Sequence, residues 1–324
     1  EIARVLRVPA AFSVESFATG IVELIGFQIE PGDSMAGKSL IEYNRLHPNA
    51  LLLCAAKRGD EVLVPNGHFV PQQGDRVYAV GTPTETSRVL RSMGRETAPI
   101  RRLSVLGGGR IALYLAWALE GLGTHITIVE QDEEKCVSIA EKLPKATVIH
   151  GDGTDHELLE SEGIFDADAF VSVTGRDEEN LLMALSAREA GVAKVLPKMS
   201  RPNYTALVHE LGIDTVISPR DATASQISSY VRGLANSQGS AVESLHKLLG
   251  GAMEAVEFTA GAATHFLNSP LKDLHFKPGL LIAAIVHGGK LIIPDGHSII
   301  SEGDRVIVVA KSLFLKDLND ILVR

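Results

Sequence analysis

Apolar residues between positions 101 and 218 alternate between two spacings. Short runs with β-branched residues are typical of buried strands, and stretches with apolar residues every three or four positions are typical of helices. The first run, Leu103 to Leu106, is followed by helical spacing from Ile111 to Leu122. Further strands are predicted over 125–129, 147–149, 169–173, 194–197 and 215–217, with helices over 132–143, 177–190 and 203–211. This strict alternation predicts an α/β fold with a doubly wound parallel sheet.

The remainder of the chain has a different organisation. Ala222 to Leu234 has the pattern of an amphipathic helix, with Ile227, Tyr230, Val231 and Leu234 on one face. A polar break over 236–240 precedes a second predicted helix from Ala241 to Leu249. Beyond Gly251 the pattern predicts short strands, a hairpin and a final helix over 312–322.

An internal repeat relates the two ends of the chain. Pro-Asn-Gly-His at 65–68 returns as Pro-Asp-Gly-His at 294–297, and Gly-Asp-Arg-Val at 74–77 returns at 303–306, both 229 residues later. Ile2 and Arg7 correspond to Ile227 and Arg232, 225 residues later. The repeat predicts two units, each a Rossmann-like lobe plus a small lobe. The first unit is entered part-way, so the chain is expected to be a fragment of a longer duplicated protein.

A glycine-rich turn joins the first predicted strand to its helix. Gly107, Gly109 and Ala112 fit the pattern G-x-G-x-x-G/A, in which the second glycine lets the backbone approach a pyrophosphate. The helix N-terminus then offers free N–H groups and a partial positive charge to that group. The turn therefore predicts a nucleotide site. The alternative is a glycine-rich turn in a domain that binds nothing.

Glu130 ends the second predicted strand, 23 residues after Gly107. This is close to the spacing expected for a carboxylate that accepts hydrogen bonds from an adenosine ribose. Its charge would repel a 2′-phosphate, which favours NAD(H) over NADP(H). ATP or ADP at the same site is the alternative ligand. Glu130 could instead be an exposed acid at a strand end.

Other candidate residues follow neighbouring strands. Thr174 and Gly175 end the fourth predicted strand beside the expected crevice, and Arg110 and Lys198 could neutralise phosphate. Asp177-Glu178-Glu179 are interpreted as first-turn acids that complement a helix dipole rather than as an acid/base pair. The histidines show no spacing suited to zinc. Neither a catalytic residue nor a metal ligand is predicted.

Composition excludes several classes of protein. With 324 residues and 45% apolar residues, the chain is long enough for two or three domains and is not disordered. The net charge of −9, with acids and bases mixed throughout, argues against nucleic acid as a partner. No apolar run approaches the length that crosses a bilayer. Cys54 and Cys136 are too few for a disulfide scaffold and suit a reducing compartment.

The repeat and four motifs together resemble the RCK (regulator of K⁺ conductance) family, and within it the TrkA-type subunits of Trk potassium-uptake systems. The motifs are Gly107-Gly108-Gly109-Arg110-Ile111, Val129-Glu130, Gly151-Asp152-Gly153-Thr154-Asp155 and Val216-Ile217-Ser218-Pro219. The resemblance implies a Rossmann-like N-lobe between two small α+β C-lobes. It places adenine-side contacts at Asp152, Gly153 and Thr154, and it adds Gly108 and Ile111 to the cofactor-binding residues.

The resemblance also implies a division of the chain. The expected parts are residual crossover helices over 1–19, a first C-lobe over 20–85, a linker over 86–100, an N-lobe over 101–220, crossover helices over 221–249 and a second C-lobe over 250–324.

A function follows from the same resemblance. The expected function is a nucleotide-sensing regulatory subunit that gates a membrane potassium channel or transporter subunit. Such a subunit would be cytoplasmic, peripheral on the inner face of the plasma membrane, and homo-oligomeric through its crossover helices. An NAD-dependent dehydrogenase with a C-lobe as substrate domain is the alternative, and turnover of 2-hydroxy acids would distinguish the two.

Overall fold

The computed structural model describes residues 1–47, 51–95, 98–201, 207–208, 211–235, 242–311 and 314–323. The chain divides into two compact units, each built from separate stretches. Unit 1 comprises Glu1–Pro9 and Thr97–Asp221, and unit 2 comprises Ala10–Glu96 and Ala222–Arg324.

Unit 1 contains a five-stranded parallel sheet with the order β10-β9-β6-β7-β8. Its strands are β6 (Arg102–Leu106), β7 (His125–Glu130), β8 (Thr147–His150), β9 (Ala169–Ser172) and β10 (Lys194–Pro197). The predicted doubly wound sheet is confirmed. The predicted sixth strand over 215–217 is wrong, since Ile217 makes only an isolated bridge to Lys198. Most of the helix expected over 203–211 lies outside the described residues.

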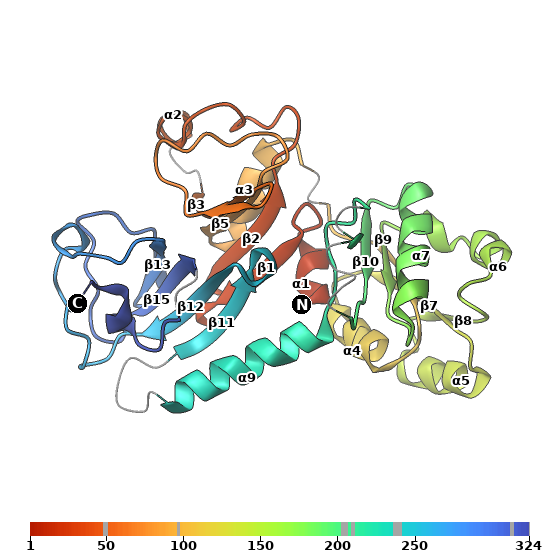
Figure 1. Cartoon of the computed structure of the whole chain (residues 1–324). Helices are drawn as coiled ribbons and strands as arrows, with labels where there is room; N and C mark the ends of the chain where they lie inside the picture. Colours follow the sequence, from red (N-terminus) through yellow and green to blue (C-terminus); the bar gives the residue numbers. More distant parts are fainter. Residues whose placement is uncertain are drawn as a thin grey trace. The chain divides into compact units, whose positions relative to one another are not determined.

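Helices cover both faces of this sheet (Figure 1). The helices are α4 (Arg110–Leu119), α5 (Glu133–Lys142), α6 (His156–Ser161) and α7 (Asp177–Glu189), with the 3₁₀ turn η2 (Ile164–Asp166). One core holds the buried residues of α4 and α5, and a second holds those of α6 and α7. The short helix α1 (Ile2–Arg7) packs on α4 and buries Ile2, Val5 and Leu6 in the first core.

Lys194 places a charge inside unit 1. Its ammonium is buried and donates to Thr215 Oγ1 at 3.0 Å. Burial lowers the pKa of Lys194 from 10.5 to about 8, and the charge of Asp214 opposes the shift. Between these two values the unfolded chain binds more protons than the folded one, so this group makes stability rise with pH across that window. Below pH 8 the full cost of burying the charge remains.

Replacing Lys194 with methionine is therefore expected to stabilise unit 1 near neutral pH. We expect Lys194→Met to raise the free energy of unfolding by about 2 kcal/mol at pH 7, after allowing for the lost hydrogen bond. The gain should disappear by pH 10. Urea unfolding followed by the fluorescence of Trp117, the single tryptophan, would measure the difference between the two proteins. A difference that is the same at pH 7 and pH 10 would contradict the buried charge.

Unit 2 contains two antiparallel sheets with matching strand orders, β1-β2-β5-β3-β4 and β11-β12-β15-β13-β14. The first sheet comprises β1 (Ser13–Phe17), β2 (Val22–Gln28), β3 (Leu52–Arg58), β4 (Glu61–Leu63) and β5 (Arg76–Gly81). The second comprises β11 (Val242–Leu248), β12 (Met253–Thr259), β13 (Leu280–His287), β14 (Lys290–Ile292) and β15 (Arg305–Lys311). The repeat predicted from sequence is thus confirmed as a structural duplication.

The two sheets of unit 2 share one apolar core. It combines buried residues of the first sheet, such as Leu24 and Val80, with residues of the second, such as Ala255 and Ile307. At its margin Glu257 Oε1 accepts a hydrogen bond from the backbone N–H of Ala18, at 3.0 Å. The two small lobes therefore fold as one body.

Helices and 3₁₀ turns complete unit 2. They are α2 (Leu40–Leu46), α3 (Pro83–Ser92), most of α9 (Pro219–Ala235) and the 3₁₀ turns η1 (Ala18–Gly20), η3 (Leu249–Gly251), η4 (Leu271–Asp273) and η5 (Leu318–Ile321). The expected linker over 86–100 is only partly a linker, because α3 occupies its first residues. Thr82 and Glu85 form a capping box at the start of α3, with Pro83 as its first residue.

Two predicted helices are wrong. Residues Val242–Leu248, expected as the second crossover helix, form strand β11. Val242, Leu245 and Leu248 recur every third residue, as on a helix, because both faces of β11 are buried and a bulge follows Val242. The described part of the predicted final helix contains only η5, followed by a bridge from Leu322 to Phe276.

Candidate functional site

A cleft of about 280 Å³ opens at the carboxyl ends of the strands of unit 1. This is the edge at which open parallel sheets bind ligands, where the strand order reverses. The predicted residues that line the cleft are Gly107, Gly109, Glu130, Asp152, Gly153, Thr154, Thr174 and Gly175. The other predicted residues, Gly108, Arg110, Ile111 and Lys198, do not line it.

The three glycines of the loop between β6 and α4 differ in what surrounds them. Gly107 has a φ of +100°, and a Cβ there would lie 3.1 Å from the backbone nitrogen of Thr174. A Cβ on Gly108 would lie 2.3 Å from Ile139 Cδ1. Gly109, the N-cap of α4, has a φ of −75° and open space around its missing side chain. Folding thus explains the first two glycines but not Gly109.

Glu130 is buried at the end of β7, where its carboxylate holds two loops. Oε2 accepts from the N–H of Gly108 at 2.8 Å, and Oε1 accepts from the N–H of Asp132 at 3.1 Å. A carboxylate has about four acceptor positions, so both oxygens can still accept a hydroxyl from the cleft. Glu130 is therefore both a support of the glycine loop and a possible ligand contact.

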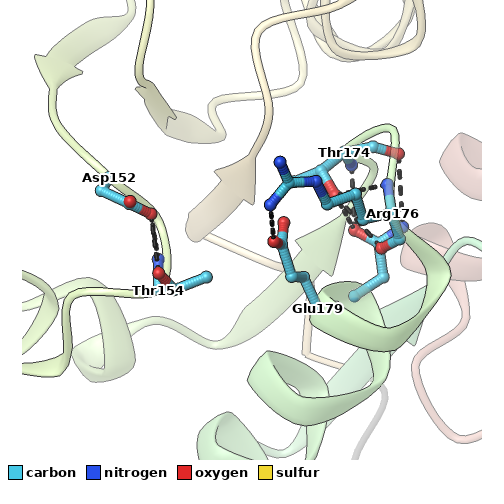
Figure 2. Close-up of polar contacts among 6 residues, drawn as sticks. Asp152, Thr154, Thr174, Arg176 and Glu179 are labelled. Atoms are coloured by element: carbon cyan, nitrogen blue, oxygen red, sulfur yellow. Dashed lines mark hydrogen bonds and ion pairs between the residues drawn. The ribbon is translucent and has the colours of Figure 1, made fainter.

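The turn after β8 forms one wall of the cleft. Asp152 Oδ1 accepts from both the N–H and the hydroxyl of Thr154, each at 2.8 Å. These hydrogen bonds stabilise the charged form and lower the pKa of Asp152 below its usual value. Figure 2 shows this pair on one side, across from Thr174, Arg176 and Glu179.

The opposite wall begins after the end of β9, where the side chain of Asn180, on α7, holds Thr174 by hydrogen bonds. The buried Asn180 side chain accepts from the N–H and the hydroxyl of Thr174 through Oδ1, both at 2.9 Å. Its Nδ2 donates to the carbonyl of Lys198 at 3.0 Å. The Lys198 ammonium donates to the carbonyl of Thr174. In this arrangement Lys198 supports the wall rather than facing the cleft.

Sequence reasoning missed four polar residues that line the cleft, namely Gln131, Lys135, Arg176 and Glu179. Arg176 pairs with Glu179 one turn along α7, and Lys135 lies 3.4 Å from Asp132. The signal for Arg176 was its place in the loop after β9, and the signal for Lys135 was its place in the first turn of α5, shortly after β7. Asp177 lies in the first turn of α7, as interpreted, and its carboxylate also accepts from the N–H groups of Ser200 and Arg201.

Comparisons with known proteins place this chain in a family. Residues 103–219 match the TrkA-N domain, and residues 255–321 match the TrkA-C domain. Trk system potassium uptake protein TrkA homolog 2 from Methanosarcina mazei is 31% identical over 322 residues, which cover 99% of this chain and 70% of that protein. The TrkA protein of Azorhizobium caulinodans is 30% identical over 321 residues, covering 98% and 69%.

Solved structures agree with the fold. The RCK domain of GsuK matches with a TM-score of 0.53 and 17% identity, covering 96% of this chain and 66% of that one. The GsuK channel bound to NAD matches with a TM-score of 0.53 and 18% identity, covering 96% and 55%. The chain thus has the fold of an RCK domain, with a Rossmann-like lobe and two small antiparallel lobes. The chain belongs to the TrkA family of Trk potassium-uptake proteins.

Within the described residues, no helix is both long enough and apolar enough to cross a membrane.

Proposed function

We propose that this chain is a regulatory part of a potassium-uptake system and that it senses an adenine nucleotide in the cleft of unit 1. The observation that carries the nucleotide is Gly109, since no protein atom beyond its chain neighbours lies within 4 Å of the position of its absent Cβ. A glycine at the start of a helix, facing open space in a cleft, is what a closely approaching pyrophosphate requires. The name of its relatives, potassium uptake proteins, supplies the process.

NAD(H) is the proposed ligand, with ATP or ADP as competitors for the same cleft. One solved relative in fold is a channel bound to NAD, which supports a dinucleotide as the first ligand to test. Differential affinity of the nucleotide for two arrangements of the protein would bias an attached membrane subunit. The sensing protein would lie in the cytoplasm against the inner face of the plasma membrane. No observation on the cleft favours the dehydrogenase, since Glu130 and Glu179 are both engaged by partners within the protein.

Selectivity for NAD(H) over NADP(H) tests the role of Glu130. Its carboxylate should accept ribose hydroxyls and repel a 2′-phosphate, so NAD(H) is expected to bind more tightly than NADP(H). Glu130→Gln should weaken NAD(H) binding by about 1–3 kcal/mol, the contribution of a hydrogen bond to a charged group. The substitution should also reduce the difference in affinity between NAD(H) and NADP(H). Titration calorimetry would measure all four affinities.

A matched control is Glu133→Gln, which removes an equal charge from an exposed position on α5 outside the cleft. It should leave both affinities unchanged. Equal binding of NAD and NADP by the natural protein would contradict the assignment of Glu130. Because Glu130 also holds the glycine loop, the unfolding free energy of each variant should be measured alongside.

A further inference from the structure

The strand order fixes which part of a bound nucleotide faces each loop. β7 and β9 flank β6 on opposite sides. In a Rossmann-like lobe the phosphates lie at the helix after the first strand, here α4, and the adenosine ribose lies at the acid after the second strand, here Glu130. A nucleotide bound in this way therefore extends past its first phosphates toward the end of β9.

The turn after β9 lies directly against the glycine loop. The missing Cβ of Gly107 would be 3.1 Å from the nitrogen of Thr174, and Arg176 lines the same cleft two residues further on. Gly175, between them, has no protein atom beyond these two neighbours within 4 Å of its absent Cβ. The group that follows the first phosphates of a nucleotide therefore lies on the Arg176 side of the cleft.

An ion pair that a ligand can replace holds Arg176 at this side of the cleft. Its guanidinium pairs with Glu179, and Figure 2 shows both side chains facing the wall that carries Asp152. The Arg176 side chain is 76% exposed. Exposed ion pairs of this kind stabilise little, whereas an arginine fork binds phosphate oxygens through two parallel hydrogen bonds. A phosphate in this part of the cleft can therefore displace Glu179.

Adenine nucleotides differ in what they place at this position. A dinucleotide carries a second ribose and a nicotinamide beyond its two phosphates, whereas ATP carries a third phosphate. If Arg176 were absent, Glu179 and Asp152 would leave this part of the cleft with only negative charge facing it. We propose that Arg176 is a specificity-determining residue that binds the terminal phosphates of a nucleoside triphosphate, and that Glu179 competes with those phosphates for it. This inference rests on the proposed nucleotide function.

The test is a set of calorimetric titrations of the full chain with AMP, ADP, ATP and NAD at one ionic strength. Arg176→Gln should weaken ATP binding about ten-fold or more and ADP binding less, while AMP and NAD change by no more than about two-fold. Glu179→Gln frees Arg176 and should tighten ATP binding about two- to five-fold.

Arg201→Gln is the matched control. Arg201, which follows β10, makes a similar exposed ion pair with Glu178 of α7, at 2.7 Å, but it does not line the cleft. It should leave ATP binding within about two-fold, because an exposed charge outside the cleft is largely screened. Equal losses for AMP, ADP and ATP in Arg176→Gln, or equal effects of Arg176→Gln and Arg201→Gln, would overturn this inference alone. A natural protein that bound none of the four nucleotides would overturn the proposed function as well.

Discussion

Gly107→Ala is expected to destabilise unit 1 by about 2–4 kcal/mol, whereas Gly109→Ala should cost no more than about 1 kcal/mol, the effect of alanine at an N-cap. At Gly107 the φ of +100° is unfavourable for any L-residue, and the added Cβ would also press on the backbone of Thr174 at 3.1 Å. At Gly109 the φ of −75° suits any residue, and a methyl group would meet no protein atom within 4 Å other than those of its chain neighbours.

The main effect of Gly109→Ala should instead be on nucleotide affinity. A methyl group on Gly109 fills the space in which we place the pyrophosphate, so Gly109→Ala should weaken NAD(H) binding about ten-fold or more. Urea unfolding followed by Trp117 fluorescence measures stability, and calorimetry measures affinity. A Gly109→Ala protein with normal stability and normal affinity would remove the main support for a nucleotide at this loop.

The parallel sheet could be predicted because β6, β9 and β10 are buried almost throughout and their residues are mostly apolar, whereas the edge strand β8 is only partly buried. Lys194–Pro197 was predicted with its observed bounds, and Glu133–Lys142 lies within the predicted range of 132–143. Strand β11 could not be separated from a helix by the same reasoning. Its residues are buried on two different faces at a spacing of three, which periodicity alone assigns to a helix.

The candidate site could be predicted only in part, for a similar reason. Glycine spacing and a strand-end acid carry a sequence pattern, so Gly107, Gly109 and Glu130 could be found. Arg176 belongs to no pattern and Glu179 only to the first-turn acids of a helix, so their place in the cleft follows from the end of β9 lying beside the glycine loop. Helix α3 is a different case, since the capping box of Thr82 and Glu85 is a local sequence pattern that marks its start.

Substitutions on α9 are expected to have the second large effect, on association of the chain. The apolar residues of this helix are exposed within the described structure. Ile227 is 58% exposed, Tyr230 69%, Val231 56% and Leu234 62%. The internal repeat indicates what such a face is for. Ile2, Val5 and Leu6, the counterparts of the first three residues 225 positions earlier, are buried in the core of unit 1 against α4. We therefore propose that α9 is an interface, through which the chain forms a homo-oligomer.

Tyr230→Asp, alone or with Leu234→Asp, should abolish association at micromolar concentration. We expect a dimer of the natural chain that persists at moderate salt, because the contact is apolar and not ionic. A buried, unpaired carboxylate should raise the dimer dissociation constant about 100-fold or more. Ser225→Asp is the matched control, since it adds the same charge about 160° around the helix from Ile227 and about 140° from Tyr230, away from the apolar face. Light scattering at several concentrations measures the mass. A natural chain that is strictly monomeric, and is unchanged by these substitutions, would refute the proposed role of α9.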